Sequence, residues 1–193
     1  MKKDIILAGV GGQGILSIAA IIGMAAIEKG LYVKQAEVHG MSQRGGAVQS
    51  HLRISSDEIA SDLIPMGEAD MILSVEPMES LRYLPFLSKT GWIITNSNPF
   101  INIPDYPDIN LLLDQIRSYK NVIVLDADAV AKKIGSSKAS NVVLLGASST
   151  HLDIPYENLE NGIRTLFGGK GASIVNLNLA ALKTGAEFIL TAL

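Results

Sequence analysis

The stretch Asp4-Ile-Ile-Leu-Ala-Gly-Val-Gly-Gly-Gln-Gly14 indicates how the chain folds, because three local patterns follow one another within it and just after it. An apolar run ends at Gly9, further glycines complete the G-x-G-x-x-G spacing, and the alanine-rich, apolar residues 15–27 come next. The run predicts a buried strand, the glycines a tight turn, and residues 15–27 a helix. In this motif Gly9 permits the turn, Gly11 lets a phosphate approach the backbone, and Gly14 lets the helix pack against the strand.

The turn between this strand and this helix is a candidate anion-binding site. A helix N-terminus offers free N–H groups and a partial positive charge to a phosphate or carboxylate. Gly12 adds backbone freedom, and Gln13 places an amide donor and acceptor at the start of the helix. The alternative is a turn that serves packing alone, which the same spacing also permits. We predict cofactor or anion contact at five residues of the turn: Gly9, Gly11, Gly12, Gln13 and Gly14.

A second strand is predicted over residues 31–36, directly before Glu37. In dinucleotide-binding folds an acidic residue about 20 positions beyond the glycines binds a ribose hydroxyl. Glu37 occupies that position, which favours a nucleotide-binding protein. A solvated carboxylate at a strand end is an equal alternative, so Glu37 by itself does not decide between them.

A polar loop over residues 38–46 follows where a crossover helix is expected. Its sequence, Val38-His-Gly-Met-Ser-Gln-Arg-Gly-Gly46, presents a hydroxyl, an amide and a guanidinium between glycines. Arginine binds a phosphate or carboxylate through two parallel hydrogen bonds. The alternative is a solvated surface loop, but loops of this composition often carry function. We predict a second set of ligand-contacting residues, with His39 as a further candidate donor: Ser42, Gln43, Arg44, Gly45 and Gly46.

The composition is that of a globular protein without redox or nucleic-acid chemistry of its own. Of the 193 residues, 48% are hydrophobic and 18% charged, which suffices for a core without disulfides. A net charge of −3 and 5% aromatic residues do not favour nucleic-acid binding. The absence of cysteine excludes disulfides, thiolate zinc sites and cysteine-bound iron–sulfur clusters within the chain. The apolar N-terminus is interrupted by Asp4 and by glycines, so we expect a cytoplasmic protein without a membrane segment.

Strands and helices alternate along the rest of the chain. Further strands are predicted over residues 47–54, 71–75, 92–95 and 121–125, and further helices over residues 78–87, 111–119, 127–134, 155–167 and 172–190. Residues 141–148 fit a helix or a strand by pattern, and their small, apolar surface favours the helix. Residues 47–54 alternate between apolar and polar, which predicts a half-exposed strand, antiparallel at a sheet edge. The whole pattern predicts an α/β protein with a Rossmann-like three-layer fold, a mostly parallel sheet and flanking helices, in a single domain over residues 1–193.

The carboxyl ends of parallel strands meet at one edge of the sheet, and ligands of such folds bind there. That edge is predicted to collect the glycine turn, residues 37–46, Glu76, Asn96 and Asp126. We expect the first two clusters to line one cleft.

The sequence contains binding groups but no recognisable reaction centre or metal site. Three histidines are scattered along the chain: His39, His51 and His151. None has a partner at metal-ligand spacing, and the last two are predicted to lie at the surface. There is no nucleophile elbow, no Walker lysine and no catalytic triad. Asp126 and Asp128 are typical of a capped helix start, and residues 168–171, with Lys170, of a turn between helices rather than a phosphate site.

Together, the two glycine motifs resemble the γ-type subunit of 2-oxoacid:ferredoxin oxidoreductases. The first is Gly9-Val-Gly-Gly-Gln-Gly14, and the second, Glu37-Val-His-Gly-Met-Ser-Gln-Arg-Gly-Gly46, is similar to the indolepyruvate-type β subunit of that family. Asn178, Ala181 and Gly185 match the closing pattern of the family. The resemblance spans nearly the whole chain and implies a single pyruvate/ketoisovalerate oxidoreductase γ-type domain.

The resemblance implies a role in the oxidative decarboxylation of an aryl 2-oxoacid with coenzyme A, which gives an acyl-coenzyme A and reduced ferredoxin. It places thiamine diphosphate and iron–sulfur clusters on a larger partner subunit of a hetero-oligomer, with coenzyme A as co-substrate and ferredoxin reached through the complex. This chain would be inactive alone, with residues 11–14 and 42–46 facing the composite active site or coenzyme A. The alternative is a stand-alone nucleotide-binding protein or NAD-dependent dehydrogenase that uses Glu37.

Overall fold

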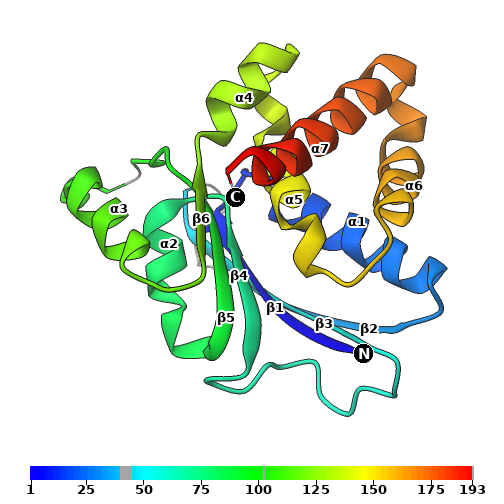
Figure 1. Ribbon diagram of the computed structural model, residues 1–193, viewed down its shortest axis with the longest axis horizontal. Coiled ribbons are helices and arrows are strands. Elements are labelled where there is room, and N and C mark those ends of the chain that lie inside the picture. The colour runs from blue at the N-terminus through cyan, green and yellow to red at the C-terminus, as the bar shows by residue number, and fades with distance from the viewer. Residues whose placement is uncertain (40–44, 102, 193) are drawn as a thin grey trace.

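Within residues 1–39, 45–101 and 103–192, which the computed structural model describes, six strands form one sheet (Figure 1). The strands are β1 (Lys2–Val10), β2 (Tyr32–His39), β3 (Ala47–Ser55), β4 (Ala69–Ser74), β5 (Leu87–Asn96) and β6 (Val122–Leu125). They lie side by side in the order β2-β3-β1-β4-β5-β6. All neighbours from β1 to β6 pair parallel, whereas β3 pairs antiparallel with both β1 and β2. Only β3 therefore runs against the others, and the prediction of a mostly parallel sheet is confirmed.

Helices lie on both sides of this sheet and give the molecule three layers (Figure 1). One face carries α2 (Pro77–Arg82), the short 3-10 turn η1 (Leu84–Phe86) and α3 (Ile109–Arg117). The helices on the other side are α1 (Ile15–Glu28), α4 (Ala127–Ile134), α5 (Ser140–Ser148), α6 (Tyr156–Phe167) and α7 (Ala172–Ala192). The α/β prediction with flanking helices is confirmed.

The central strand β1 supplies side chains to both of these layers. Ile5 and Leu7 belong to the core beneath α1, α5 and α7, while Ile6 and Ala8 belong to the smaller core beneath η1. All four side chains are fully buried. A strand covered on both faces requires apolar residues at every position, which explains the continuous run that the sequence shows.

The strand β3 differs from its prediction in position and in exposure. It lies inside the sheet, between β1 and β2, so β2 and not β3 forms the edge. His51, predicted at the surface, is only 4% exposed. The N–H of Ile64 donates to His51 Nδ1 at 3.0 Å, and the Phe86 ring meets the imidazole edge-on at 5.2 Å between ring centroids. Residues distant in sequence cover this face, so alternation within the strand does not reveal it.

Other elements match their predictions to within a few residues, with two corrections. The helix predicted over residues 78–87 ends at Arg82, because Pro85 lacks the N–H that a continuing helix needs. The strand predicted over residues 92–95 begins at Leu87. His151, predicted as a surface residue, is half-buried and stacks on Trp92 with ring centroids 4.1 Å apart.

The buried His51 makes the stability of the protein depend on pH. Burial lowers the pKa of His51, and the Arg53 guanidinium lowers it further. An unfolded chain binds this proton near pH 6.5, whereas the folded protein binds it only at a lower pH. The contribution of neutral His51 to stability is therefore fully present above about pH 6.5 and is lost as the pH falls through the folded-state pKa. We expect chemical denaturation from pH 7.5 to 5 to show this fall, with a shallower slope for His51→Asn, which keeps an acceptor for Ile64 without the titration. Equal slopes for the two proteins would contradict the prediction.

Candidate functional site

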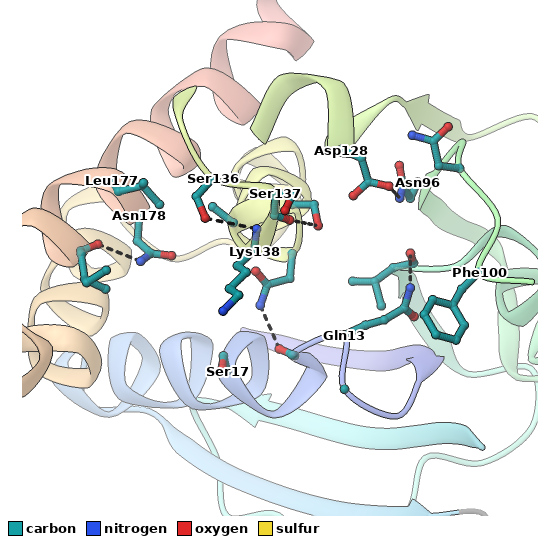
Figure 2. A pocket seen from close by; sticks show the side chains of 18 of the residues that line it. Gln13, Ser17, Asn96, Phe100, Asp128, Ser136, Ser137, Lys138, Leu177 and Asn178 are labelled. Atoms are coloured by element: carbon teal, nitrogen blue, oxygen red, sulfur yellow. Dashed lines mark hydrogen bonds between the residues drawn. The ribbon is translucent and has the colours of Figure 1, made fainter. Parts of the chain in front are cut away.

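A cavity of about 700 Å³ lies at the carboxyl edge of the sheet, between the start of α1 and the N-terminal ends of α4, α5 and α7 (Figure 2). Four parts of the chain supply most of its wall: residues 12–14, residues 96–100 at and beyond the end of β5, residues 136–141 before and within α5, and residues 167–178 around the start of α7. Segments from across the sequence therefore meet at the edge where ligands of α/β folds bind.

The glycine turn contributes Gly12, Gln13 and Gly14 to the cavity. Gln13 is fixed at both ends of its amide: Oε1 accepts from the N–H of Val10 at 2.8 Å, and Nε2 donates to the carbonyl of Val75 at 3.5 Å. Gly14 caps α1 in the left-handed conformation, with φ of 82°. The turn thus joins the ends of β1 and β4 and directs the N-terminus of α1 toward the cavity.

Two glycines of the turn have roles that differ from those predicted. Gly9 lies within β1, where an added Cβ would meet Val75 Cγ2 at 2.3 Å, so it allows close packing and does not form the turn. The N–H of Gly11 donates to the carbonyl of Gly46 at 2.9 Å. This donor is engaged within the protein, so Gly11 holds the turn against the start of β3.

Residues 136–141 form a wall of the cavity that sequence reasoning missed. Gly135 caps the end of α4, and the Ser-Ser-Lys-Ala-Ser-Asn run beyond it brings three polar side-chain types, serine, lysine and asparagine, to the cavity. Lys138 points into the opening in Figure 2. Asn141 Nδ2 donates to the carbonyl of Gly14 at 3.1 Å and ties α5 to α1. A serine-rich run with a lysine, directly before a helix N-terminus, was the available signal.

The segment before α7 contributes a second cation. Lys170 lines the cavity, and its ammonium lies 5.3 Å from the centroid of the Phe167 ring. Residues 168–170 form the predicted turn between helices. Asn178 is buried and its Nδ2 donates to the carbonyl of Ile174 at 2.8 Å. Lys138 and Lys170 therefore face one cavity from separate elements.

The second predicted cluster is placed only in part. Ser42, Gln43 and Arg44 lie outside the described residues. Gly45 and Gly46 directly precede β3, and the described lining of the cavity includes the glycine turn but neither of these two residues. The described contact between the two predicted clusters is the hydrogen bond from Gly11 to Gly46.

The position of Glu37 argues against an ordinary dinucleotide site. In a dinucleotide-binding unit the second strand of the chain neighbours the first, which brings its terminal acid close to the glycines. Here β3 lies between β1 and β2, and Glu37 pairs with Ser50 of β3. The ribose role considered for Glu37 is therefore wrong for this topology.

Of the polar residues predicted at the carboxyl edge of the sheet, Asn96 lines the cavity, whereas Glu76 and Asp126 are not part of its described lining. Asp126 caps α4 by accepting from the N–H of Ala129 at 2.8 Å, so the predicted capped start is confirmed. Asn96 accepts from the N–H of Ala127 and donates to Asp128 Oδ2, both at 3.1 Å. These contacts fix the start of α4 on the ends of the strands and leave Asn96 and Asp128 on the cavity wall.

Comparison with known proteins identifies the family. The model of the pyruvate ferredoxin/flavodoxin oxidoreductase family matches residues 4–188. The chain belongs to this family. Among curated members it is 40% identical to indolepyruvate oxidoreductase subunit IorB of Archaeoglobus fulgidus, covering 96% of this chain and 94% of the relative. It is 36% identical to the IorB subunit of Methanothermobacter thermautotrophicus, covering 96% of both chains. The resemblance predicted from the glycine motifs is confirmed.

Solved structures of this oxidoreductase family share the fold. The pyruvate oxidoreductase subunit PORC of Thermotoga maritima superposes with a TM-score of 0.74 over 96% of both chains, at 22% identity. The 2-oxoglutarate:ferredoxin oxidoreductase of Magnetococcus marinus, solved with 2-oxoglutarate, coenzyme A and succinyl-CoA bound, gives a TM-score of 0.78 at 22% identity. That match covers all of this chain but 31% of the other, so the same fold occurs there as one part of a longer chain.

The described residues contain neither a cluster of metal ligands nor a membrane-spanning helix. Among them, no group of three or more His, Cys, Asp and Glu side chains is arranged to bind a metal. None of the helices in the described part of the chain is long and apolar enough to cross a membrane. The curated relatives are named as oxidoreductase subunits, and the described features of this chain that could bind a ligand are the cavity and its polar lining.

Proposed function

We propose that this chain is the γ-type subunit of an indolepyruvate-type 2-oxoacid:ferredoxin oxidoreductase, with residues 1–193 as a single domain. Within a cytoplasmic hetero-oligomer it holds coenzyme A for a reaction centre on a larger subunit. The complex decarboxylates an aryl 2-oxoacid oxidatively, transfers the acyl group to coenzyme A and passes two electrons to ferredoxin. The names of the IorB relatives support the substrate class.

The observation that carries the coenzyme A proposal is the cavity with its two lysines. Coenzyme A carries a diphosphate and a ribose phosphate, which require cations and hydrogen-bond donors. Lys138 and Lys170 supply the cations, residues 136–140 supply hydroxyls, and the N-terminus of α1 faces the same space. A volume of about 700 Å³ accommodates a substantial part of such a ligand.

Iron–sulfur clusters do not fit this chain. Iron–sulfur clusters are held by cysteine thiolates, and the sequence contains no cysteine. We therefore propose that the clusters and thiamine diphosphate reside on the larger partner subunit. Gly12, Gln13 and Gly14 face the cavity and stay within the proposed ligand site. From the family resemblance, we propose that residues 42–46 face the composite active site or coenzyme A.

Removing either cavity lysine is expected to weaken the use of coenzyme A. Lys138→Met and Lys170→Met keep the apolar stem and remove the charge, so each should raise the KM for coenzyme A about tenfold, as for a charge-assisted hydrogen bond. The measurement is ferredoxin reduction by the complex co-purified with its larger subunit. Lys183→Met is the matched control, since Lys183 lies on α7, largely exposed, and pairs with Glu187. Equal KM values for all three variants and the wild type would refute the coenzyme A site.

Comparing the isolated chain with the co-purified complex distinguishes an oxidoreductase subunit from a stand-alone dehydrogenase. The isolated chain is expected to show no turnover, and to gain it only with a partner that carries thiamine diphosphate and iron–sulfur clusters. Tight NAD binding by the isolated chain, lost on Glu37→Ala, would instead support a stand-alone dehydrogenase and refute the proposal.

A further inference from the structure

Glu76 is a fully buried carboxylate at the carboxyl edge of the sheet, two residues beyond the end of β4. Its neighbour Val75 lines the cavity and holds Gln13 of the glycine turn through its carbonyl. A buried carboxylate is costly unless several donors satisfy its oxygens. Its retention at this position therefore calls for a reason beyond filling the core.

Three donors satisfy Glu76, and two of them come from the segment that follows β5. The backbone N–H of Glu79 donates to Oε2 at 2.9 Å, which makes Glu76 the N-cap of α2. The backbone N–H of Phe100 donates to Oε1 at 3.4 Å, and the Tyr106 hydroxyl donates to the same oxygen. One carboxylate thus holds the segment at two points on either side of its bend.

The held segment forms one wall of the cavity. Asn98, Pro99 and Phe100 line it, and Phe100, which is 43% exposed, faces the opening in Figure 2. An exposed aromatic side chain on a loop has few contacts of its own to fix its position. The backbone N–H of Phe100 is instead bonded to Glu76 at 3.4 Å from inside the protein, while Asn98, two residues earlier, donates to Asp126 Oδ1 at 2.6 Å.

Tyr106 is suited to remain a donor under all ordinary conditions. Burial, followed by the hydrogen bond to Glu76, raises the pKa of Tyr106. The phenol therefore keeps its proton at neutral pH and donates it to the carboxylate. Tyr106 also packs against the core formed by α3 and the outer face of β5, so the donor itself is anchored.

We propose that Glu76 and Tyr106 are positioning residues for coenzyme A, because together they fix the Phe100 wall of the cavity. This inference rests on the proposed function. Neither residue lines the described part of the cavity, so they act through Phe100 and its neighbours. Loosening the wall should lower the affinity for coenzyme A and leave the chemistry on the partner subunit unchanged.

The test compares Tyr106→Phe with two control variants in the co-purified complex. Tyr106→Phe removes one donor to a charged group, and we expect the KM for coenzyme A to rise about tenfold while kcat stays within about twofold. Tyr119→Phe makes the same chemical change on a partly exposed residue outside the network. Glu79→Gln alters a buried carboxylate of the same helix that pairs with Arg82 at 2.9 Å and not with the Phe100 segment. It should lower the melting temperature without raising the KM.

The outcomes separate this proposal from the proposed function. A raised KM confined to Tyr106→Phe supports the positioning role. An unchanged KM in Tyr106→Phe overturns the positioning role alone. So does a KM in Glu79→Gln that rises in proportion to the loss of melting temperature. A wild-type complex whose turnover does not depend on coenzyme A overturns the proposed function, and the positioning role with it.

Discussion

Gly185→Ala is expected to destabilise the protein more than any other single methyl addition considered, by about 3 kcal/mol, because it overpacks a helix crossing. An added Cβ at Gly185 on α7 would lie 2.0 Å from the carbonyl oxygen of Val143 on α5. The obstacle is backbone, so no side chain can turn away. In a protein of this size the loss corresponds to a fall in melting temperature of roughly 10 °C.

The crossing is built from a reciprocal pair of glycines. A Cβ at Gly146 on α5 would lie 2.1 Å from the carbonyl oxygen of Leu182 on α7. Because both helices carry residues of the cavity wall near their N-terminal ends, separating them also changes the cavity. Gly185→Ala should therefore raise the KM for coenzyme A in whatever fraction of the complex still folds.

Gly23→Ala is the matched control for this prediction. Gly23 is also a buried helical glycine, but its added Cβ would meet only Val33 Cγ1 at 3.8 Å, an ordinary contact. There the gain in helix propensity is unopposed, so the variant should be more stable by about 0.5–1 kcal/mol. Differential scanning calorimetry of both variants measures the two shifts. Shifts of the same sign would show that close helix approach does not govern Gly185.

The sequence predicted those features that depend on short stretches of chain. The α4 boundaries at Ala127 and Ile134 follow from an aspartate cap and a terminal glycine, and both signals lie within a few residues of the helix. The same holds for the strand–turn–helix unit around Gly14. Local geometry that is set by local residues can be inferred without knowing the rest of the fold.

Features that depend on distant contacts were not predicted. The insertion of β3 between β1 and β2 depends on strand pairing, which the pattern of residues 47–54 does not encode. The burial of His51 results from Ile64 and Phe86, which lie 13 or more positions away in the sequence. The cavity wall at residues 136–141 reaches the glycine turn through a hydrogen bond between residues 127 positions apart. In each of these cases tertiary packing, and not the local sequence, determines where the residues lie.

Gly14→Ala is the second substitution with a large expected effect, because it acts on the conformation of the turn and on the link from α1 to α5 together. A side chain at φ of 82° costs about 1–2 kcal/mol by itself. The added Cβ would also lie 2.4 Å from Asn141 Nδ2, which must then give up its bond to the Gly14 carbonyl. That loss adds about 1 kcal/mol, so we expect about 2–3 kcal/mol of destabilisation and a raised KM for coenzyme A.

Gly12→Ala separates the two contributions to this effect, because Gly12 has φ of 99° but open space within 4 Å of an added Cβ. It should show the conformational cost alone, about 1–2 kcal/mol. Asn141→Ala removes the obstacle, so the double variant Gly14→Ala/Asn141→Ala should be more stable than the sum of the single losses implies. Urea denaturation of the wild type, Gly14→Ala, Asn141→Ala and the double variant completes the cycle, and Gly12→Ala is measured beside them. Strict additivity, or equal losses for Gly12→Ala and Gly14→Ala, would show that the contact between the turn and α5 has no part in holding the cavity together.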